Sequence, residues 1–245
     1  MNRNMSAVIG ALALTGVTIP AIAADKPELN TDLQKNGYSV GYDIGRSIKR
    51  QIVNVDGDSM AHGLKDGMSG APAALPDAEI QQRFAAVRQE SAQKIPEQNK
   101  KDGEAFLAKN KKEKGVKTTA SGLQYKIITA GKGKQPKPED TVTVNYRGTL
   151  IDGTEFDSSY KRNQPATFPV KGVIPGWTEA LPMMKEGSKW MLYIPANLAY
   201  GERNAGQLIG PNSTLIFEVE LLSISKPTPP APAPAPQASP APEKP

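Results

Sequence analysis

The sequence contains no cysteine and only one histidine, His62. The absence of cysteine excludes disulfide bonds, catalysis by a thiol and metal sites built on cysteine. A single histidine leaves no histidine pair, and no other residues show the spacing of metal ligands. We therefore expect neither a metal nor a cofactor, and we expect His62 to be a surface or core residue.

Long apolar runs are also scarce, because the only extended one reaches from Ala7 to Ile22, after Arg3 and before the letters AIAAD. This arrangement is typical of a secretory signal peptide that is cleaved after Ala23 or Ala24. An N-terminal membrane anchor is the alternative, although the run is short of the roughly 20 apolar residues of a spanning helix. Export without disulfides favours a periplasmic or secreted bacterial protein, and association with the outer membrane stays open.

The net charge of +5 at pH 7 arises from one stretch of the chain. Between Arg83 and Lys117, ten lysines and arginines stand against five acidic residues. No aromatic residues are interleaved with these charges in the manner of a nucleic-acid-binding surface. The pattern indicates a solvated helix face, and we do not expect nucleic acid as a partner.

The first half of the mature chain has helical periodicity. Residues 25–75 carry apolar residues at helical spacing, with Asn30 or Thr31 as a helix cap and Gly67 and Gly70 closing a second helix. Residues 76–115 predict one long polar helix with a narrow apolar seam, which Pro96 should kink or end. The seam consists of Ile80, Phe84, Val87 and Ser91. It favours pairing with a second copy of the chain, the alternative being packing on the chain's own N-terminal helices.

In residues 116–226 apolar residues recur at every second position, and Thr, Val, Ile and Tyr are frequent, which predicts strands. The segment PGWTEALPMMKEG between them predicts a short helix that Gly187 ends. The expected fold class is α+β: an antiparallel half-barrel sheet wrapped around a short helix, preceded by an all-α domain. Residues 227–245 are mostly proline and alanine, which predicts a disordered tail.

Aromatic and apolar residues gather at strand ends and loops of this second half, which indicates a concave apolar pocket. They are Tyr146, Phe156, Phe168, Val173, Ile174, Trp177, Tyr200, Ile209 and Phe217. Polar groups at this pocket would be two tyrosine hydroxyls, Asp157 and, as its partner, Arg162. Asp157 could equally cap the turn in the letters DSSY. An apolar pocket without nucleophile or base suits the rotation of a bond before proline, because no bond is broken.

The segments VTVNYRGTLIDGTEFDSS, VIPGWTEALPMMKEG, LAYG and LIFEVELL resemble the FKBP-type peptidyl-prolyl isomerases in order and spacing. The helical half resembles their exported macrophage infectivity potentiator group, whose N-terminal domain dimerises. The resemblance implies Trp177 as the pocket floor, with Asp157, Tyr200 and Phe156 also catalytic. The remaining residues implied to bind substrate are Tyr146, Arg162, Phe168, Val173, Ile174 through its N–H, Ile209 and Phe217. The chain departs from many small family members at Ala166 and Ala205.

The expected organisation is therefore a signal peptide (1–24), a dimerisation domain (25–75), a connecting helix (76–115), an isomerase domain (116–226) and a tail (227–245). The expected partners are proline-containing polypeptides and a second copy of the chain, with the macrolides tacrolimus and rapamycin as inhibitors. The alternative function is a holdase-type chaperone in which isomerase activity is incidental.

Overall fold

A computed structural model describes residues 27–226, so the expected signal peptide and the Pro/Ala-rich tail lie outside the described part. Contacts divide the chain into two compact units after Tyr42. None of the helices between residues 27 and 226 is both long and apolar enough to cross a membrane.

The two N-terminal helices begin and end where their capping residues allow. α1 (Asp32–Gln51) begins after Thr31, whose Oγ1 accepts from the Gln34 N–H at 3.2 Å. Gln34 Oε1 in turn accepts from the Thr31 N–H at 2.9 Å, which completes a reciprocal capping box. α2 (Gly57–Ser69) ends at Gly70, which has a φ of 71° that suits glycine. The predicted caps at Thr31 and Gly70 are confirmed, whereas Gly67 lies inside α2 and does not end it.

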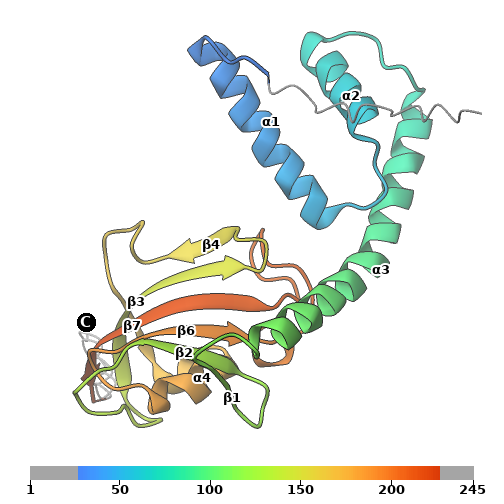
Figure 1. The fold of residues 1–245 in the computed structure, drawn as a ribbon. Helices are drawn as coiled ribbons and strands as arrows, with labels where there is room; N and C mark the ends of the chain where they lie inside the picture. The colour runs from blue at the N-terminus through green and yellow to red at the C-terminus, as the bar shows by residue number, and fades with distance from the viewer. Residues whose placement is uncertain (1–26, 227–245) are drawn as a thin grey trace, which may run out of the picture. The chain divides into compact units, whose positions relative to one another are not determined.

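α3 (Asp77–Asn110) runs through Pro96 without ending there, and it bends partway along its length (Figure 1). The apolar seam is exposed at Ile80 and Phe84. Farther along, α3 packs against the sheet domain: Asn110 Nδ2 donates to Gln124 Oε1 at 2.8 Å, and Gln124 Nε2 donates to the Leu107 carbonyl at 2.9 Å. The second half of this polar helix is thus held by buried side-chain amides.

The sheet domain is antiparallel throughout, with the strand order β1-β2-β6-β7-β3-β4 and β5 paired to β3 (Figure 1). Buried and partly exposed residues alternate along its three central strands, so one face carries the core. The strands are β1 (Val116–Thr118), β2 (Gln124–Thr129), β3 (Thr141–Leu150), β4 (Glu155–Ser158), β5 (Ala166–Pro169), β6 (Lys189–Ile194) and β7 (Leu215–Ser225).

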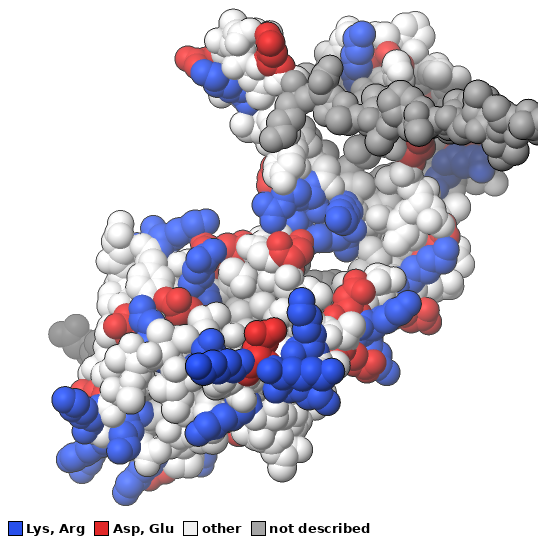
Figure 2. Space-filling model, viewed as in Figure 1, with Lys and Arg blue, Asp and Glu red and all other residues white. Residues whose placement is uncertain are grey.

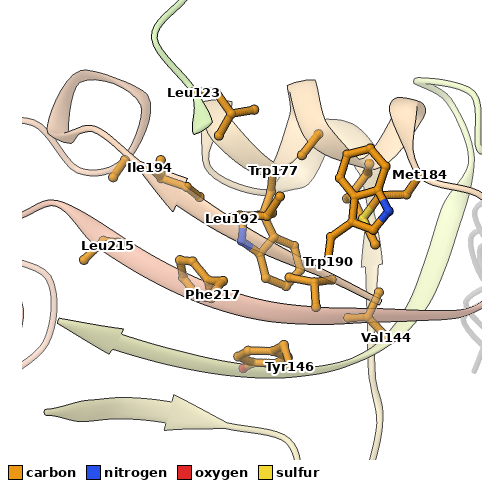
Figure 3. Packing of buried hydrophobic residues seen from close by; sticks show 14 of the residues in the cluster. Leu123, Val144, Tyr146, Trp177, Met184, Trp190, Leu192, Ile194, Leu215 and Phe217 are labelled. Atoms are coloured by element: carbon orange, nitrogen blue, oxygen red, sulfur yellow. The ribbon is translucent and has the colours of Figure 1, made fainter. Parts of the chain in front are cut away.

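α4 (Pro175–Ala180) lies against the buried face of the sheet (Figures 1 and 3). Pro175 occupies the first helical turn, where its missing N–H is not needed. Gly176 brings the helix close to β6, since a Cβ there would lie 2.6 Å from Ile194 Cγ2. Short 3₁₀ turns flank this region at Val170–Gly172, Leu181–Met183 and Ala196–Leu198. The predicted fold class, strands around one short helix after an all-α part, is confirmed.

Basic and acidic side chains intermingle on the face of the molecule that Figure 2 shows. Within α3, Lys94 pairs with Glu90 at 2.6 Å and Arg83 with Glu79 at 3.5 Å, each one helical turn apart. Both pairs are exposed to solvent, where such contacts stabilise a helix only slightly. This arrangement fits the expected solvated helix face.

The contact of Gly103 with the sheet domain predicts an inverted effect of a usually favourable substitution. A Cβ on Gly103 would lie 2.3 Å from Thr214 Oγ1. Although alanine favours a helix over glycine by about 1 kcal/mol, the overlap should cost about 1–3 kcal/mol. We therefore expect Gly103→Ala to lower the free energy of unfolding in urea. The exposed neighbour variant Glu104→Ala should stay within about 0.5 kcal/mol of wild type; equal stability of Gly103→Ala would contradict the contact.

Candidate active site

A cavity of about 810 Å³ opens between β3, β4, α4 and the segment 199–217. All predicted site residues line it except Arg162, which lies beside it and contacts Asp157. The predicted residues on its surface are Tyr146, Phe156, Asp157, Phe168, Val173, Ile174, Trp177, Tyr200, Ile209 and Phe217. Residues more than 70 positions apart in the sequence therefore meet at one site.

The floor of the cavity is the indole of Trp177, which is only 4% exposed. α4 presents this ring from its first turn, and three aromatic rings surround it edge to face. The ring centroids of Tyr146, Phe168 and Phe217 lie 5.5, 5.9 and 5.2 Å from that of Trp177. Figure 3 shows Trp177 next to Phe217, with Tyr146 on the neighbouring strand. Edge-to-face packing holds each ring in one orientation and keeps the floor apolar.

Gly148 makes room for two walls of the cavity, and the sequence analysis did not single it out. A Cβ on Gly148 would lie 2.5 Å from the ring of Phe156 and 2.8 Å from that of Phe217. Gly148 pairs with Phe217 in the β3–β7 register. A glycine inside a strand is a known sign of close approach, so the letters YRGTL held the signal.

Tyr146, Asp157 and Arg162 form a closed triangle of hydrogen bonds at the cavity's edge. The Tyr146 hydroxyl and Arg162 Nη1 both donate to the Asp157 carboxylate. Arg162 Nη2 also donates to the Tyr146 hydroxyl at 2.9 Å. The turn that follows uses Ser158 instead, whose Oγ accepts from the Lys161 N–H at 3.4 Å. The Asp157 side chain thus faces its predicted partner Arg162.

The triangle keeps its members in defined protonation states. Burial raises the pKa of the Asp157 carboxyl, but the hydrogen bonds from Tyr146 and Arg162 outweigh burial and leave the pKa below its ordinary value. Burial raises the pKa of the Tyr146 hydroxyl, and its bond to Asp157 raises it further. At neutral pH the rim therefore holds a carboxylate, a guanidinium and a protonated phenol.

The segment 199–213 closes one side of the cavity as a small hairpin. Ala205 and Ile209 exchange backbone hydrogen bonds of 2.9 and 3.3 Å, and Ile209 is 7% exposed. At the base, the Asn212 N–H donates to the Gly201 carbonyl at 2.7 Å. This hairpin contributes lining residues that the sequence analysis missed, because small and polar residues carry no pocket signal on their own. They are Ala199, Arg203, Gly206, Gln207 and Leu208.

The structure also shows where Ile174, Ala166, Ala205 and His62 lie. Ile174 precedes α4 and lines the cavity, and within residues 27–226 its N–H donates to no other backbone atom. Ala205 lines the cavity, whereas Ala166 lies in β5 and packs against the core. His62 lies on α2 and is exposed. The described part of the chain contains no cluster of three or more acidic or histidine side chains placed to hold a metal ion.

Comparison with known proteins identifies two family models along the chain. Residues 132–222 match "FKBP-type peptidyl-prolyl cis-trans isomerase". Residues 33–127 match "Domain amino terminal to FKBP-type peptidyl-prolyl isomerase". The two matches cover the helical half and the sheet domain in the predicted order.

Curated relatives match most of the chain. It is 46% identical to an outer membrane protein MIP of Legionella longbeachae over 229 residues, which is 91% of this chain and 98% of that protein. It is also 46% identical to the FKBP-type peptidyl-prolyl cis-trans isomerase FkpA of Escherichia coli, over 84% of this chain and 81% of that one. The crystal structure of FkpA from Escherichia coli superposes with a TM-score of 0.56 at 42% identity, covering 82% of this chain and all of that one.

The lowered pKa of Asp157 predicts how stability changes in acid. A carboxyl whose folded pKa is lowered stabilises the fold above its unfolded pKa of about 3.9 and loses this contribution as pH falls through the folded value. The melting temperature of wild type should therefore exceed that of Asp157→Asn by a constant margin from pH 7 to pH 5. The margin should shrink below about pH 4. Melting curves at several pH values test this, and a margin that does not change with pH would contradict it.

Proposed function

The chain belongs to the FKBP-type peptidyl-prolyl cis-trans isomerases, and we propose that its reaction takes place in the aromatic cavity above Trp177. Its activity is the isomerisation of peptide bonds that precede proline. The relatives are named as isomerases, which does not favour the holdase alternative. One observation carries the site proposal: a single cavity combines an apolar floor at Trp177 with a charged edge at Asp157.

Rotation about an X–Pro bond faces a barrier of about 20 kcal/mol and takes about 10–100 s without a catalyst. The barrier arises because the twisted state loses amide resonance. Without resonance, the nitrogen and the carbonyl oxygen carry less separated charge. A dry apolar floor such as Trp177 then binds the twisted state better than the planar one, and this difference lowers the barrier.

The polar rim has two proposed tasks. The Tyr200 hydroxyl and the Ile174 N–H would donate to peptide carbonyls and hold the chain on either side of the rotating bond. The Asp157 carboxylate, kept ionised by Arg162 and Tyr146, would disfavour the planar amide, whose oxygen is more negative. Phe156, Phe168, Val173, Ile209 and Phe217 would enclose the proline ring. The same features would accept tacrolimus or rapamycin.

The N-terminal half supports a homodimer. Apolar side chains stand exposed on all three N-terminal helices, which a monomer would leave in contact with water. They include Leu33, Val40, Tyr42, Leu64, Met68 and Phe84, of which Leu33 and Met68 are more than 80% exposed. A second copy of the chain would cover them, with residues 25–75 as the dimerisation domain, 76–115 as the connecting helix and 116–226 as the isomerase domain.

Export to the bacterial periplasm or beyond is the proposed location. The apolar run before Ala23 supports it, and so does the total absence of cysteine. A relative of nearly equal length is named an outer membrane protein, which supports association of this chain with that membrane. Its proposed substrates are other exported polypeptides that contain proline.

The double variant Asp157→Ala, Tyr200→Phe tests the site. Loss of the two polar groups should reduce kcat/KM about tenfold or more for a peptide with leucine before proline, since the lost Tyr200 hydrogen bond and the lost Asp157 charge should each cost about 1 kcal/mol or more. Tacrolimus should inhibit wild type. Lys134→Ala, an exposed change outside the cavity, should leave kcat/KM as in wild type. Full activity of the double variant would refute the site assignment.

Sedimentation of the chain without its signal peptide tests the dimer. We expect wild type to sediment with the mass of two copies, and a chain without residues 25–75 to sediment as one. Phe84→Glu, which places a charge on the exposed seam of α3, should weaken the dimer. Gln82→Glu adds the same charge two residues away, outside the seam, and should not. A wild-type chain that sediments as a monomer would end the dimer proposal.

A further inference from the structure

The hairpin 199–213 is a thin wall between two cavities. One is the proposed active site, and the other, of about 620 Å³, lies behind the hairpin and is bordered by the middle of α3. Residues 206–209 line both cavities. Open space thus lies on both sides of residues 206–209, while the side chain of Ile209 is buried against the core.

Two side-chain amides tie the base of the hairpin to α3. Asn99 Nδ2 donates to the Pro211 carbonyl at 2.8 Å, and Asn212 Nδ2 donates to the Pro96 carbonyl at 3.4 Å. The bonds run in opposite directions between the same two segments. They are the side-chain hydrogen bonds that join α3 to residues 199–213 within the described part of the chain.

The backbone geometry of both segments fits this contact. Gly210 lies so close to the helix that a Cβ there would be 3.1 Å from Asn99 Nδ2. Asn212 has a φ of 56°, a left-handed conformation that asparagine tolerates better than most residues. One turn farther along α3, Gly103 touches Thr214 at the start of β7. The contact therefore extends along α3 from Pro96 to Gly103.

We infer that Asn99 is a positioning residue for the isomerase reaction: it holds the hairpin that carries Tyr200 and Ile209 in the position that binds peptide. The inference rests on the proposed function of the cavity. If the tether is lost, the hairpin spends less time in the binding position, and the apparent affinity falls by that fraction. Once a peptide is bound, the hairpin with Tyr200 is in the same position as in wild type, and Trp177 and Asp157 lie on other elements, so the bound peptide should still rotate at the same rate.

The catalytic unit then begins earlier in the chain than the expected isomerase domain. The isomerase domain expected from the sequence begins at residue 116, after α3 has ended. The tether places part of the support of the peptide site on α3, some twenty residues earlier. A helix that connects two domains would then also contribute to substrate affinity.

The full-length variant Asn99→Leu tests the inference, with Gln98→Leu as its control. Leucine has the same branching and number of side-chain heavy atoms as asparagine and cannot donate to Pro211. Gln98 bonds only within the helix, to Asp102 at 2.8 Å, so its loss should not reach the hairpin. For a short proline peptide we expect KM to rise about threefold to tenfold in Asn99→Leu while kcat stays within about twofold. Gln98→Leu should match wild type in both constants.

Amide hydrogen exchange gives a readout that does not depend on activity. The Ala205 and Ile209 amides, which bond across the hairpin, should exchange about threefold to tenfold faster in Asn99→Leu than in wild type. Asn212→Gly keeps the left-handed backbone, removes only the side-chain donor and should act in the same direction.

The possible results separate the two proposals. Unchanged exchange and unchanged KM in both Asn99→Leu and Asn212→Gly would overturn the inference, even if both variants melt at a lower temperature. If the two amides exchange faster in Asn99→Leu but kcat falls by the same factor while KM stays as in wild type, the inference would also be overturned. Inactivity of wild type itself would instead refute the proposed function, and exchange would still decide whether the tether exists.

Discussion

The indole of Trp177 meets the rings of Phe217, Tyr146 and Phe168 edge to face, at centroid distances of 5.2, 5.5 and 5.9 Å. These rings come from α4 and from three strands that are distant in the sequence. The same contact that closes the core of the half-barrel therefore forms the floor of the cavity. Stability and the shape of the site depend on one cluster, because moving any of these rings would open the core as well as the pocket.

The charged groups of the site lie where the cluster meets solvent. Asp157 would be costly to bury alone, but Tyr146 and Arg162 satisfy it, and its side chain keeps contact with water. Tyr146 belongs to both the aromatic cluster and the hydrogen-bonded polar groups, since its ring packs on Trp177 while its hydroxyl bonds to Asp157. One side chain thus aligns the apolar floor with the polar rim, which suits a reaction that needs a dry floor and fixed charges but no covalent catalyst.

Much of this arrangement could be predicted from local sequence. The alternation of β3 and β7 follows from a period of two. The short helix α4 begins at Pro175 as predicted, although it ends at Ala180 rather than at Gly187. The predicted lining residues could be named because they belong to sequence motifs that follow one another in the order and spacing of a known family. Pro96 led to an expectation of a kink or an end, and the helix continues past it because the contacts of Asn99, Gly103 and Asn110 hold the following turns. None of these three residues signals such a contact by its type.

The sequence by itself determined the fold class and identified the aromatic and charged side chains that line the cavity, because periodicity, turn residues and ordered motifs are local properties. Only the tertiary structure decided which groups meet. Register placed Gly148 opposite Phe217 and so made space for two walls. Close approach of α3 to the hairpin let one asparagine amide from each segment bond to a carbonyl of the other. Such contacts depend on distances between segments far apart in the chain, and a spacing within one segment carries no information about them.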